Sequence, residues 1–432
     1  TLPQDCAALY RPRKPRDSPL YQLIESRYDE VKGQWEERFE RRFGFWRGAV
    51  EDAVFAFLDC GIYEHGFARV VCNDCRAEFL VAFSCQRRGL CPSCAAKRGA
   101  IFGALLAEEV LDEVGHALWT FTIPRMLRPY FLHHRELLGE LCRAGWEVVR
   151  ELMVAATQRP DLQPGMVSVV HTAGDLLGWH PHAHAIASRG GWDADGQWVP
   201  VPFVGTGEAE RLFQHRVIAL LRDQGLLSDE RIELLLSWRH SGFSVHNTVR
   251  VAAGDTAGIE RLGRYLLRSP VAVERLLFDL STGEVLYHPK QHHDRGKPRA
   301  ERLEPAEFLA RLLQHVPEPR LHQVRYYGRY SNVARARRSL DETNARPAMP
   351  PHREEPDTAE RRQARRAWAQ LIRRVYEVDP LICQQCGGKM RVVAFLLDPA
   401  AIGQILAHLA RQARLAPRGP PAPNVDQACA AS

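Results

Sequence analysis

Residues 180–186 read HPHAHAI, and this run carries the most information about the chain. In a β-strand, side chains two positions apart point to the same face, so His182 and His184 share one face and Ala183 faces a core on the other. His180 has the same parity, but the intervening proline is expected to interrupt the strand. Two neutral imidazoles can bind a divalent ion that keeps positions open for phosphate oxygens. The simpler alternative is a histidine pair without an ion.

Regular secondary structure is expected on both sides of this run. Helical spacing of apolar residues predicts helices between residues 20 and 60 and over 99–114, 135–157, 207–224, 228–238 and 257–268. Runs rich in β-branched and aromatic residues predict strands at 67–72, 78–83, 117–124, 166–172 and 182–188. Strands interleaved with helices indicate an α+β or α/β core. Prolines and mixed charge predict a linker at 341–360, then a basic helix near 360–377 and a Pro-rich tail from 417.

The helix expected over 257–268 carries a tyrosine among arginines. In the run IERLGRYLLRSP, Tyr265 shares a helical face with Arg261 and Arg268, and Arg264 is its neighbour in sequence. A phenol has a pKa near ~10 and is a weak nucleophile, whereas nearby guanidinium groups favour the phenolate and bind a phosphodiester. Without further context, the same pattern describes an ordinary amphipathic helix with an aromatic side chain in the core.

Two close cysteine pairs predict a structural zinc site. Cys72 and Cys75, followed by Cys91 and Cys94, supply four thiolates from two tight turns, which is the donor set of a tetrahedral site. The segment is too short for a core of its own, so the metal would supply folding energy. Cys85 lies inside the loop, either as a small buried side chain or as a replacement for one of the four.

A third pair, Cys383 and Cys386, is followed by two glycines and has the sequence of half a zinc site. The glycines suit a knuckle turn, but the completing ligands are open, with His352 and His408 as candidates. Closely spaced cysteines favour metal ligation over disulfides in a reducing compartment. We therefore expect zinc rather than disulfide bonds.

The composition is that of a globular protein of two or three units, with 432 residues, 45% hydrophobic and 25% charged. The net charge of +6 is mild, but 14 arginines, no lysine and only 6 acidic residues lie between Arg320 and Arg374. Guanidinium groups bind phosphate in a bidentate manner, so this segment, with Arg335, Arg337 and Arg338, is a candidate DNA contact rather than only a solvated linker. Neither a membrane-spanning run nor a secretion signal is evident, so we expect a cytoplasmic protein, associated with the bacterial nucleoid.

Taken together, these motifs resemble the HUH rolling-circle transposases of the IS91 type, over nearly the whole chain. The likeness lies in HGFARVVCNDCRAEFLVAFSC with RRGLCPSCAAKRG, ALWTFTIPRMLR, GDLLGWHPHAHAI, RYLLRSPVAVERL, RYYGRYSNVARARR and VYEVDPLICQQCGGKMRVVAFLLDP. It implies an α+β fold with an HUH endonuclease-like antiparallel sheet flanked by helices. The implied order is a helical region at 1–60, a zinc-binding module at 61–98, a catalytic domain at 99–340, the linker, and a C-terminal zinc-knuckle region at 361–416.

The resemblance also implies a chemistry. His182 and His184 would bind a catalytic Mg²⁺ or Mn²⁺, Tyr265 would form a 5′-phosphotyrosine, and structural Zn²⁺ would occupy the cysteines. The partner would be single-stranded DNA at the ends of the mobile element, with no membrane. Some members carry a second tyrosine four residues from the first; here Arg261 and Ser269 hold those positions, which indicates the single-tyrosine subgroup. The third metal ligand stays open, with His171 on a neighbouring strand.

Two other functions are compatible with parts of the sequence. One is a zinc-dependent DNA-binding protein, derived from a transposase, that has lost its chemistry. The other is a histidine-based metallohydrolase of small molecules, for which Asp175 is the only carboxylate close to the histidines in sequence. The second function leaves the cysteine pairs and the arginine-rich segment without a purpose. The sequence leaves the oligomeric state open.

Overall fold

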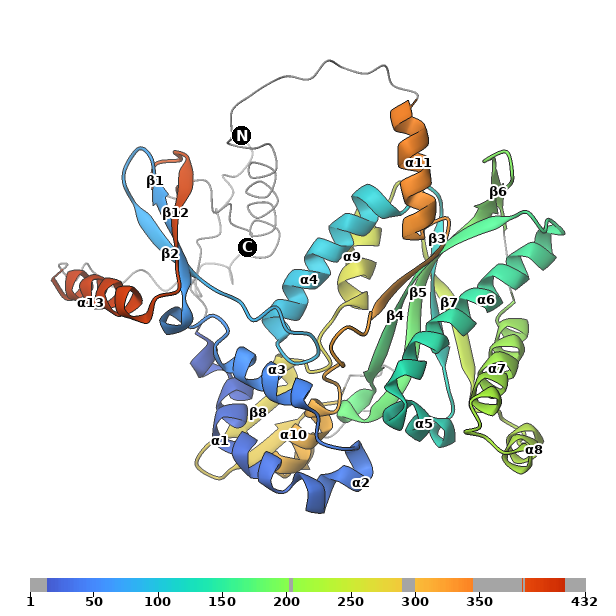
Figure 1. Cartoon of the computed structure of the whole chain (residues 1–432), viewed down its shortest axis with the longest axis horizontal. Helices are drawn as coiled ribbons and strands as arrows, with labels where there is room; N and C mark the ends of the chain where they lie inside the picture. The colour runs from blue at the N-terminus through green and yellow to red at the C-terminus, as the bar shows by residue number, and fades with distance from the viewer. Residues whose placement is uncertain (1–13, 202–204, 290–299, 345–382, 384, 416–432) are drawn as a thin grey trace, which may run out of the picture. The chain divides into compact units, whose positions relative to one another are not determined.

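The computed structural model describes residues 14–201, 205–289, 300–344, 383 and 385–415 (Figure 1). Contacts divide the chain into a larger unit of residues 1–59 and 85–380 and a smaller unit of residues 60–84 and 381–432. Most of the predicted linker, the basic helix near 360–377 and the tail from 417 lie outside the described residues. Among the helices that are described, none is both long and apolar enough to span a bilayer.

An antiparallel sheet forms the centre of the larger unit. Its strand order is β11-β4-β5-β3-β7, and β6 pairs with β5. The strands are β3 (His116–Thr122), β4 (Gln163–Ala173), β5 (Trp179–Trp192), β6 (Trp198–Pro200), β7 (Ser244–Val251) and β11 (Val324–Gly328). This sheet, flanked by helices, confirms the predicted α+β class.

The prediction that a proline interrupts the histidine strand was wrong, because β5 runs through Pro181. The partner strand β3 ends at Thr122, which lies opposite His182, so Pro181 has no partner on that side. On the other side, the β4–β5 register shifts between His171 and Ala173. A proline lacks only its N–H, and it is tolerated where no ladder hydrogen bond needs that group.

Helices cover both faces of the sheet (Figure 1). One apolar core joins Ala183, Ala185 and Ala187 of β5 to α6 and α7, and a second core joins Ile186 to α4 and α9. His182 and His184 have the parity of Ile186 and therefore lie on the face that α4 and α9 cover. The helices are α4 (Pro92–Leu105), α5 (Arg128–His133), α6 (Leu138–Thr157), α7 (Thr206–Asp223), α8 (Asp229–Ser237), α9 (Thr256–Leu266) and α11 (Asn332–Asn344).

The helix predicted over 99–114 begins earlier than expected. Cys91 stands at its N-cap and Pro92 at its first position, where a proline needs no hydrogen-bond partner. One π-helical turn, Leu106–Val110, follows α4 before β3 begins. The start of this helix therefore lies within the cysteine segment.

The N-terminal helices pack with a small sheet that follows α9 in the chain. They are α1 (Pro19–Gly33), α2 (Glu40–Phe43) and α3 (Gly48–Leu58), and the sheet has the order β10-β9-β8. The remaining elements are β8 (Leu276–Asp279), β9 (Glu284–Tyr287), β10 (Glu301–Leu303) and α10 (Pro305–Leu313).

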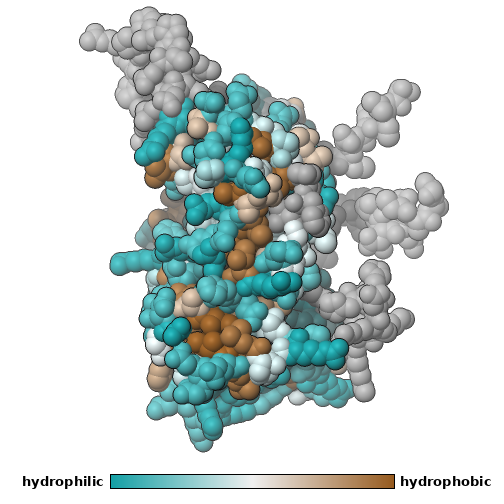
Figure 2. Space-filling view, turned by 90° about the vertical axis from the view of Figure 1, so that its right-hand side faces the viewer, coloured by the Kyte–Doolittle hydropathy of each residue, from teal (hydrophilic) through white to brown (hydrophobic). Residues whose placement is uncertain are grey.

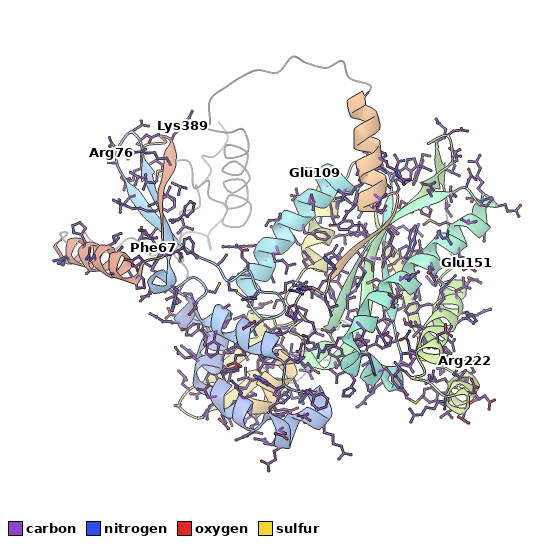
Figure 3. The ribbon with its side chains drawn as sticks, viewed as in Figure 1. Phe67, Arg76, Glu109, Glu151, Arg222 and Lys389 are labelled. Atoms are coloured by element: carbon purple, nitrogen blue, oxygen red, sulfur yellow. The ribbon has the colours of Figure 1, made fainter. Side chains whose placement is uncertain are left out.

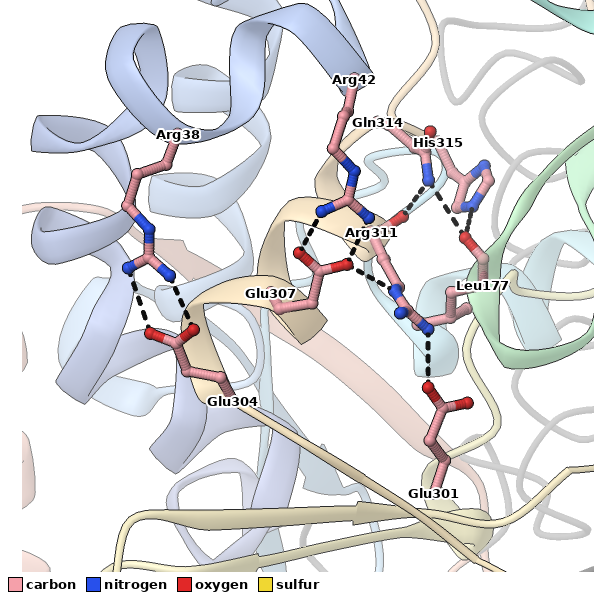
Figure 4. A network of polar contacts seen from close by, with 9 residues as sticks. All are labelled: Arg38, Arg42, Leu177, Glu301, Glu304, Glu307, Arg311, Gln314 and His315. Carbon is pink, nitrogen blue, oxygen red and sulfur yellow. Dashed lines mark hydrogen bonds and ion pairs between the residues drawn. The ribbon is translucent and has the colours of Figure 1, made fainter.

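A polar network ties α10 to its surroundings (Figure 4). Arg38 and Arg42 form paired contacts with Glu304 and Glu307 at 2.7–3.1 Å. At the end of α10, the buried Gln314 and His315 side chains lie 3.1 and 2.9 Å from the Leu177 carbonyl oxygen. Leu177 has a φ of +60°, an uncommon conformation for a leucine. The network therefore holds a strained turn directly before β5.

The smaller unit is a three-stranded sheet with one helix. Its order is β12-β1-β2, formed by β1 (Phe67–Cys72), β2 (Glu78–Ala82) and β12 (Met390–Leu396), with α13 (Pro399–Leu415) after it. Phe67, Leu80 and Ile402 form its core. Figure 3 shows Arg76 and Lys389 together at the opposite end of this sheet from Phe67. The strands predicted at 67–72 and 78–83 are confirmed, whereas β12 was not predicted.

One side of the larger unit exposes apolar side chains. Figure 2 shows that side as mainly hydrophilic, with a compact hydrophobic patch in its lower part. Leu234, Leu236 and Trp238, in or just after α8, are 50%, 60% and 40% exposed. This patch does not take part in the site described next.

Candidate active site

Three histidines from adjacent strands converge on the face that α4 and α9 cover. One ligand nitrogen from each of His171, His182 and His184 lies within 4.8 Å of the others. His171 of β4 is directly opposite His182 in the β4–β5 register, and His184 follows two residues along β5. The ring centroids are 4.7–5.4 Å apart. The third imidazole, which the sequence could not assign, thus comes from His171.

Hydrogen bonds orient each ring from outside the group. Thr120 Oγ1 lies 3.0 Å from His184 Nδ1, and His182 Nδ1 lies 2.6 Å from the His180 carbonyl oxygen. His171 Nε2 lies 2.7 Å from the carbonyl oxygen of Leu266, the last residue of α9. A histidine that binds a metal usually donates its other N–H in this way. These contacts leave the second nitrogen of each ring available to a ligand, and that of His184 lies 3.4 Å from Tyr265 Oη.

The surroundings of His182 favour its neutral form. His182 and His184 are only 7% and 5% exposed. Burial lowers the pKa of His182 well below its usual value, and the charge of His171 lowers it further. Neutral imidazole is the form that binds a metal ion. Among the described residues, no carboxylate belongs to this group. Asp175 forms an ion pair with Arg275 at 3.4 Å.

Tyr265 of α9 lies beside the histidines. Its Oη is 3.4 Å from His184 Nε2, and the two ring centroids are 5.1 Å apart. The guanidinium carbon of Arg268 lies 4.4 Å from the centroid of the tyrosine ring. The structure thus brings together a phenol, a guanidinium group and three imidazoles from three separate segments of the chain.

Close packing between α4 and α9 fixes the height of the tyrosine above the sheet. The side chain of Asp255 caps α9 by accepting the Gly258 N–H at 2.8 Å. A Cβ added to Gly263 of α9 would lie 2.4 Å from the Cα of Gly103 in α4. A Cβ added to Gly103 would lie 2.6 Å from the Glu260 carbonyl oxygen. Only glycine lets these two backbones touch.

The structure separates the three arginines predicted on α9. Arg268 alone contacts Tyr265, because α9 ends at Leu266 and the chain folds back over the ring. Arg264 pairs with Glu260 at 3.3 Å, and Arg261 lies 3.9 Å from an oxygen of Asp255. Both are exposed and remain candidates for contact with DNA beyond the site itself.

The arginines predicted on α11 differ in their surroundings. Arg335 donates to Asn332 at 2.8 Å, and its guanidinium carbon lies 5.3 Å from the centroid of the Tyr326 ring. Arg338 is half-buried and donates to the Arg329 carbonyl oxygen at 2.8 Å, whereas Arg337 is exposed. Arg337 is therefore the most accessible of the three predicted DNA contacts.

The tyrosines before α11 are unsuited to nucleophilic attack. Tyr330 is fully buried and hydrogen-bonded to His116 at 2.7 Å. Tyr327 stacks on Trp146 with centroids 5.6 Å apart, and burial raises its pKa far above the usual value. Burial also raises the pKa of Tyr326.

The cysteine pairs combine differently from the prediction. The sulfur atoms of Cys72, Cys75, Cys383 and Cys386 all lie within 4.8 Å of one another in the smaller unit. The prediction that Cys72 and Cys75 share a site with Cys91 and Cys94 was therefore wrong. The reason is that β12 pairs with β1 and places Met390 opposite Cys72, so the C-terminal pair comes beside the first one. These thiols, rather than His408, complete the C-terminal half site; His352 lies outside the described residues.

The knuckle of the C-terminal pair has the geometry of a metal-binding turn. The Gly387 N–H donates to the Cys383 carbonyl oxygen at 2.8 Å, and Gly387 has a φ of +73°. Backbone N–H groups of Cys386 and Gln385 lower the pKa of the Cys383 thiol to about 7. A lowered pKa favours the thiolate, which is the form that binds zinc.

Cys91 and Cys94 belong to a second thiol group, in the larger unit. The sulfur atoms of Cys85, Cys91 and Cys94 lie within 4.8 Å of one another, with Cys85 and Cys94 at 3.4 Å. Cys85 therefore lies with the other two thiols, where its sulfur can serve as a ligand. The group lies at the start of α4, the helix whose glycine contacts α9.

Two family models match parts of this chain. Residues 165–338, which include the histidines and Tyr265, match the family described as "Putative transposase". Residues 31–123, which include Cys85, match the family described as "Transposase zinc-binding domain".

Two curated relatives are similar over most of their length. The "Transposase for insertion sequence element IS801" of Pseudomonas savastanoi pv. phaseolicola is 26% identical over 309 residues, which is 67% of this chain and 72% of the relative. "Putative transposase y4qJ" of Sinorhizobium fredii is 27% identical over 280 residues, or 60% of this chain and 69% of the relative. No solved structure matches the chain.

Proposed function

Because the chain is a transposase of the IS91 type with an N-terminal zinc-binding domain, we propose that it cuts and rejoins single-stranded DNA through a covalent bond to Tyr265. The observation that supports this most strongly is the distance of 3.4 Å between Tyr265 Oη and His184 Nε2, at the edge of a three-histidine group. A nucleophile held beside a phosphate-binding centre makes an otherwise bimolecular displacement effectively unimolecular.

In the proposed step, Tyr265 Oη attacks the phosphorus of the scissile phosphodiester in line with the leaving group. The new bond joins Oη to phosphorus, and the bond from phosphorus to the 3′-oxygen breaks. The phenol gives up its proton, and the leaving 3′-oxygen takes one up as a hydroxyl. Arg268, whose guanidinium carbon lies 4.4 Å from the centroid of the Tyr265 ring, would stabilise charge on the phosphate. The phosphotyrosine ester conserves the bond energy, so the reverse attack by a 3′-hydroxyl rejoins the strand without ATP.

The donor set fits a divalent ion. His171, His182 and His184 would hold it through the nitrogens that face one another, and their outer hydrogen bonds would fix the rings. The ion would polarise a non-bridging phosphate oxygen. Since imidazole nitrogen suits transition-metal ions and Mg²⁺ prefers oxygen ligands, we expect Mn²⁺ to support cleavage better than Mg²⁺.

The cysteine groups would hold structural zinc. Four sulfur atoms from Cys72, Cys75, Cys383 and Cys386 match a closed tetrahedral site, which has no open position for catalysis. Cys85, Cys91 and Cys94 would supply ligands to another zinc ion at the start of α4. Zinc would thus support both units rather than take part in the reaction.

Covalent trapping tests the proposed nucleophile. Labelled single-stranded oligonucleotides from the ends of the mobile element, incubated with the protein and Mn²⁺, should give an adduct that survives a denaturing gel. Tyr265→Phe should abolish the adduct while changing the dissociation constant for the same DNA by less than about threefold. Tyr326→Phe is the matched control and should keep the adduct.

Peptide mapping of the adduct identifies the residue directly. A phosphopeptide that contains Tyr265 supports the proposal. An adduct that persists in the Tyr265→Phe protein would refute this nucleophile. A wild-type protein that binds the DNA but never forms an adduct would instead support the function of a DNA-binding protein without chemistry.

A further inference from the structure

A cavity of about 560 Å³ adjoins the histidine group in the larger unit. Its walls are the segment before α4, the first turns of α4, the end of β4 and the segment Leu266–Arg275 after α9. His171 belongs both to the cavity wall and to the histidine group. Arg268, which lies over the Tyr265 ring, also lines it. The cavity therefore begins at the reacting centre, and its volume falls within the ~300–1,000 Å³ of ordinary ligand sites.

Positive charge dominates the cavity wall. Arg88, Arg98, Arg268 and Arg275 all line it, against the single carboxylate of Glu274. Arg275 is already paired with Asp175. Within the described part of the chain, no carboxylate forms an ion pair with any of the other three arginines. Three guanidinium charges thus face the same space without a carboxylate partner in the described residues, although the Cys94 thiolate is close enough to act on Arg98.

The two arginines farthest from Tyr265 in the chain are also partly desolvated. Arg88 donates to the backbone carbonyl oxygens of Leu321 and Glu318 at 2.7 and 3.3 Å, which orient its head but leave its charge unbalanced. Arg98 is half-buried in the same wall. Bringing like charges together in a half-buried wall is unfavourable unless an anion compensates.

One further polar atom in the wall has no partner in the described residues. Ser269 Oγ is buried and makes no hydrogen bond there. Ser269 follows Arg268 in sequence, and both residues line the cavity. Arginine and serine are common protein donors to the phosphate oxygens of nucleic acids.

We propose that this cavity binds the sugar–phosphate backbone of the single strand next to the scissile phosphate, with Arg88, Arg98, Arg268 and Ser269 as its phosphate contacts. The inference rests on the proposed function, because it takes the strand cut at Tyr265 to be the occupant. A strand that extends from the histidine group past Arg268 would reach Arg98 and Arg88 on the facing wall. These residues would contact the phosphates and not the bases. They would therefore position a single strand of any sequence relative to Tyr265.

Chemically modified DNA tests the contact directly. The protein is used with Tyr265→Phe in the background, so that binding is measured without reaction. Oligonucleotides carry one neutral methylphosphonate at successive phosphates around the cleavage position. We expect one or two flanking positions at which the neutral group weakens binding about tenfold, as loss of a charge-assisted hydrogen bond does.

The arginine variants then decide the assignment. Arg98→Gln and Arg88→Gln should each weaken binding about tenfold and reduce the slope of log K against log salt by about 0.7. In each variant, the methylphosphonate at the matching position should have no further effect. Arg222→Gln, on α7 and outside the cavity wall (Figure 3), is the matched control and should change neither quantity. If every methylphosphonate weakens binding equally with and without Arg88 and Arg98, the proposal is overturned.

Arg98 lies one helical turn after Cys94, so a substitution at Arg98 could also disturb the thiol group. This effect needs a measurement of its own. Zinc content and thermal unfolding are therefore recorded for each variant. Arg98→Lys keeps the charge and should restore the salt slope. A loss of zinc in Arg98→Gln with an unchanged methylphosphonate pattern in both arginine variants would overturn the proposal. If the wild type forms no adduct but the coupling is present, the cleavage proposed at Tyr265 fails, and the cavity is a DNA-backbone site without that chemistry.

Discussion

The substitution Gly263→Ala is expected to slow covalent attack by Tyr265 about 100-fold while leaving the protein folded. The added Cβ would lie 2.4 Å from Gly103 Cα. Non-bonded carbon atoms approach to ~3.5–4.0 Å, so α4 and α9 must separate by about 1 Å. Tyr265 lies two residues further along α9 and moves with it. A displacement of ~1 Å at the reacting centre lowers a rate ~10²-fold.

The effect on stability is expected to be smaller than the effect on rate. Overpacking costs ~1–3 kcal/mol, while replacing a helical glycine by alanine returns up to ~1 kcal/mol of helix propensity. The free energy of unfolding should therefore fall by about 1–2 kcal/mol. Single-turnover adduct formation, quantified on denaturing gels, gives the rate, and urea denaturation gives the free energy.

Gly207→Ala is the matched control for a glycine in a helix. A Cβ added at Gly207 of α7 meets nothing within 4 Å, so this variant should react at the wild-type rate. A Gly263→Ala protein that forms the adduct as fast as the wild type would refute the reasoning. The reasoning would also be refuted if the rate of adduct formation fell only in proportion to the fraction of Gly263→Ala protein that is unfolded. The loss would then reflect the stability of the protein and not the position of Tyr265.

Further predictions concern the outer hydrogen bonds, the thiols and pH. Thr120→Val removes the partner of His184 Nδ1 and should weaken Mn²⁺ binding ~10–100-fold in calorimetric titrations; unchanged affinity would remove His184 from the metal site. Cys72→Ser and Cys383→Ser should each lose the same zinc equivalent by elemental analysis, so that the double variant loses no more than either single one. Burial lowers the pKa of His116 to about 4, whereas the unfolded imidazole takes up a proton near ~6.5, so stability should fall as pH decreases between these values. His116→Phe should remove about 2 kcal/mol of the difference in unfolding free energy between pH 7 and pH 5, measured with urea; an unchanged difference would show that another group is responsible.

Local periodicity predicted three of the six strands of the large sheet, β3, β4 and β5, and the shared face of two of its three clustered histidines. The two-residue repeat of a strand places His182 and His184 on one face whatever the rest of the chain does, and Ala183 is fully buried on the other face, as expected. His171 could not be assigned in this way. Its position depends on the register between β4 and β5, which tertiary packing sets and the spacing of residues does not.

The prediction of which cysteine pairs share a zinc site was wrong for a similar reason. The spacing of the residues identifies each cysteine pair as half of a zinc site. It does not say which two pairs lie together in the fold. Cys72 and Cys386 are 314 positions apart and come together only because β12 joins the edge of β1. Gly103 and Gly263 are another long-range feature. In sequence, each glycine only lowers the helix propensity of its own helix, and the reason for it becomes clear from the close contact between the two backbones.

The pairing of β1 with β12 also has a consequence for biosynthesis. Cys72 is synthesised 314 positions before Cys386, and β1 has no β12 beside it until that stretch of chain has been made. A nascent or truncated product lacks that neighbour and half of its sulfur ligands. A premature stop codon between β1 and β12 would remove one strand from the sheet of the smaller unit. The smaller unit can therefore fold only after β12 has been synthesised.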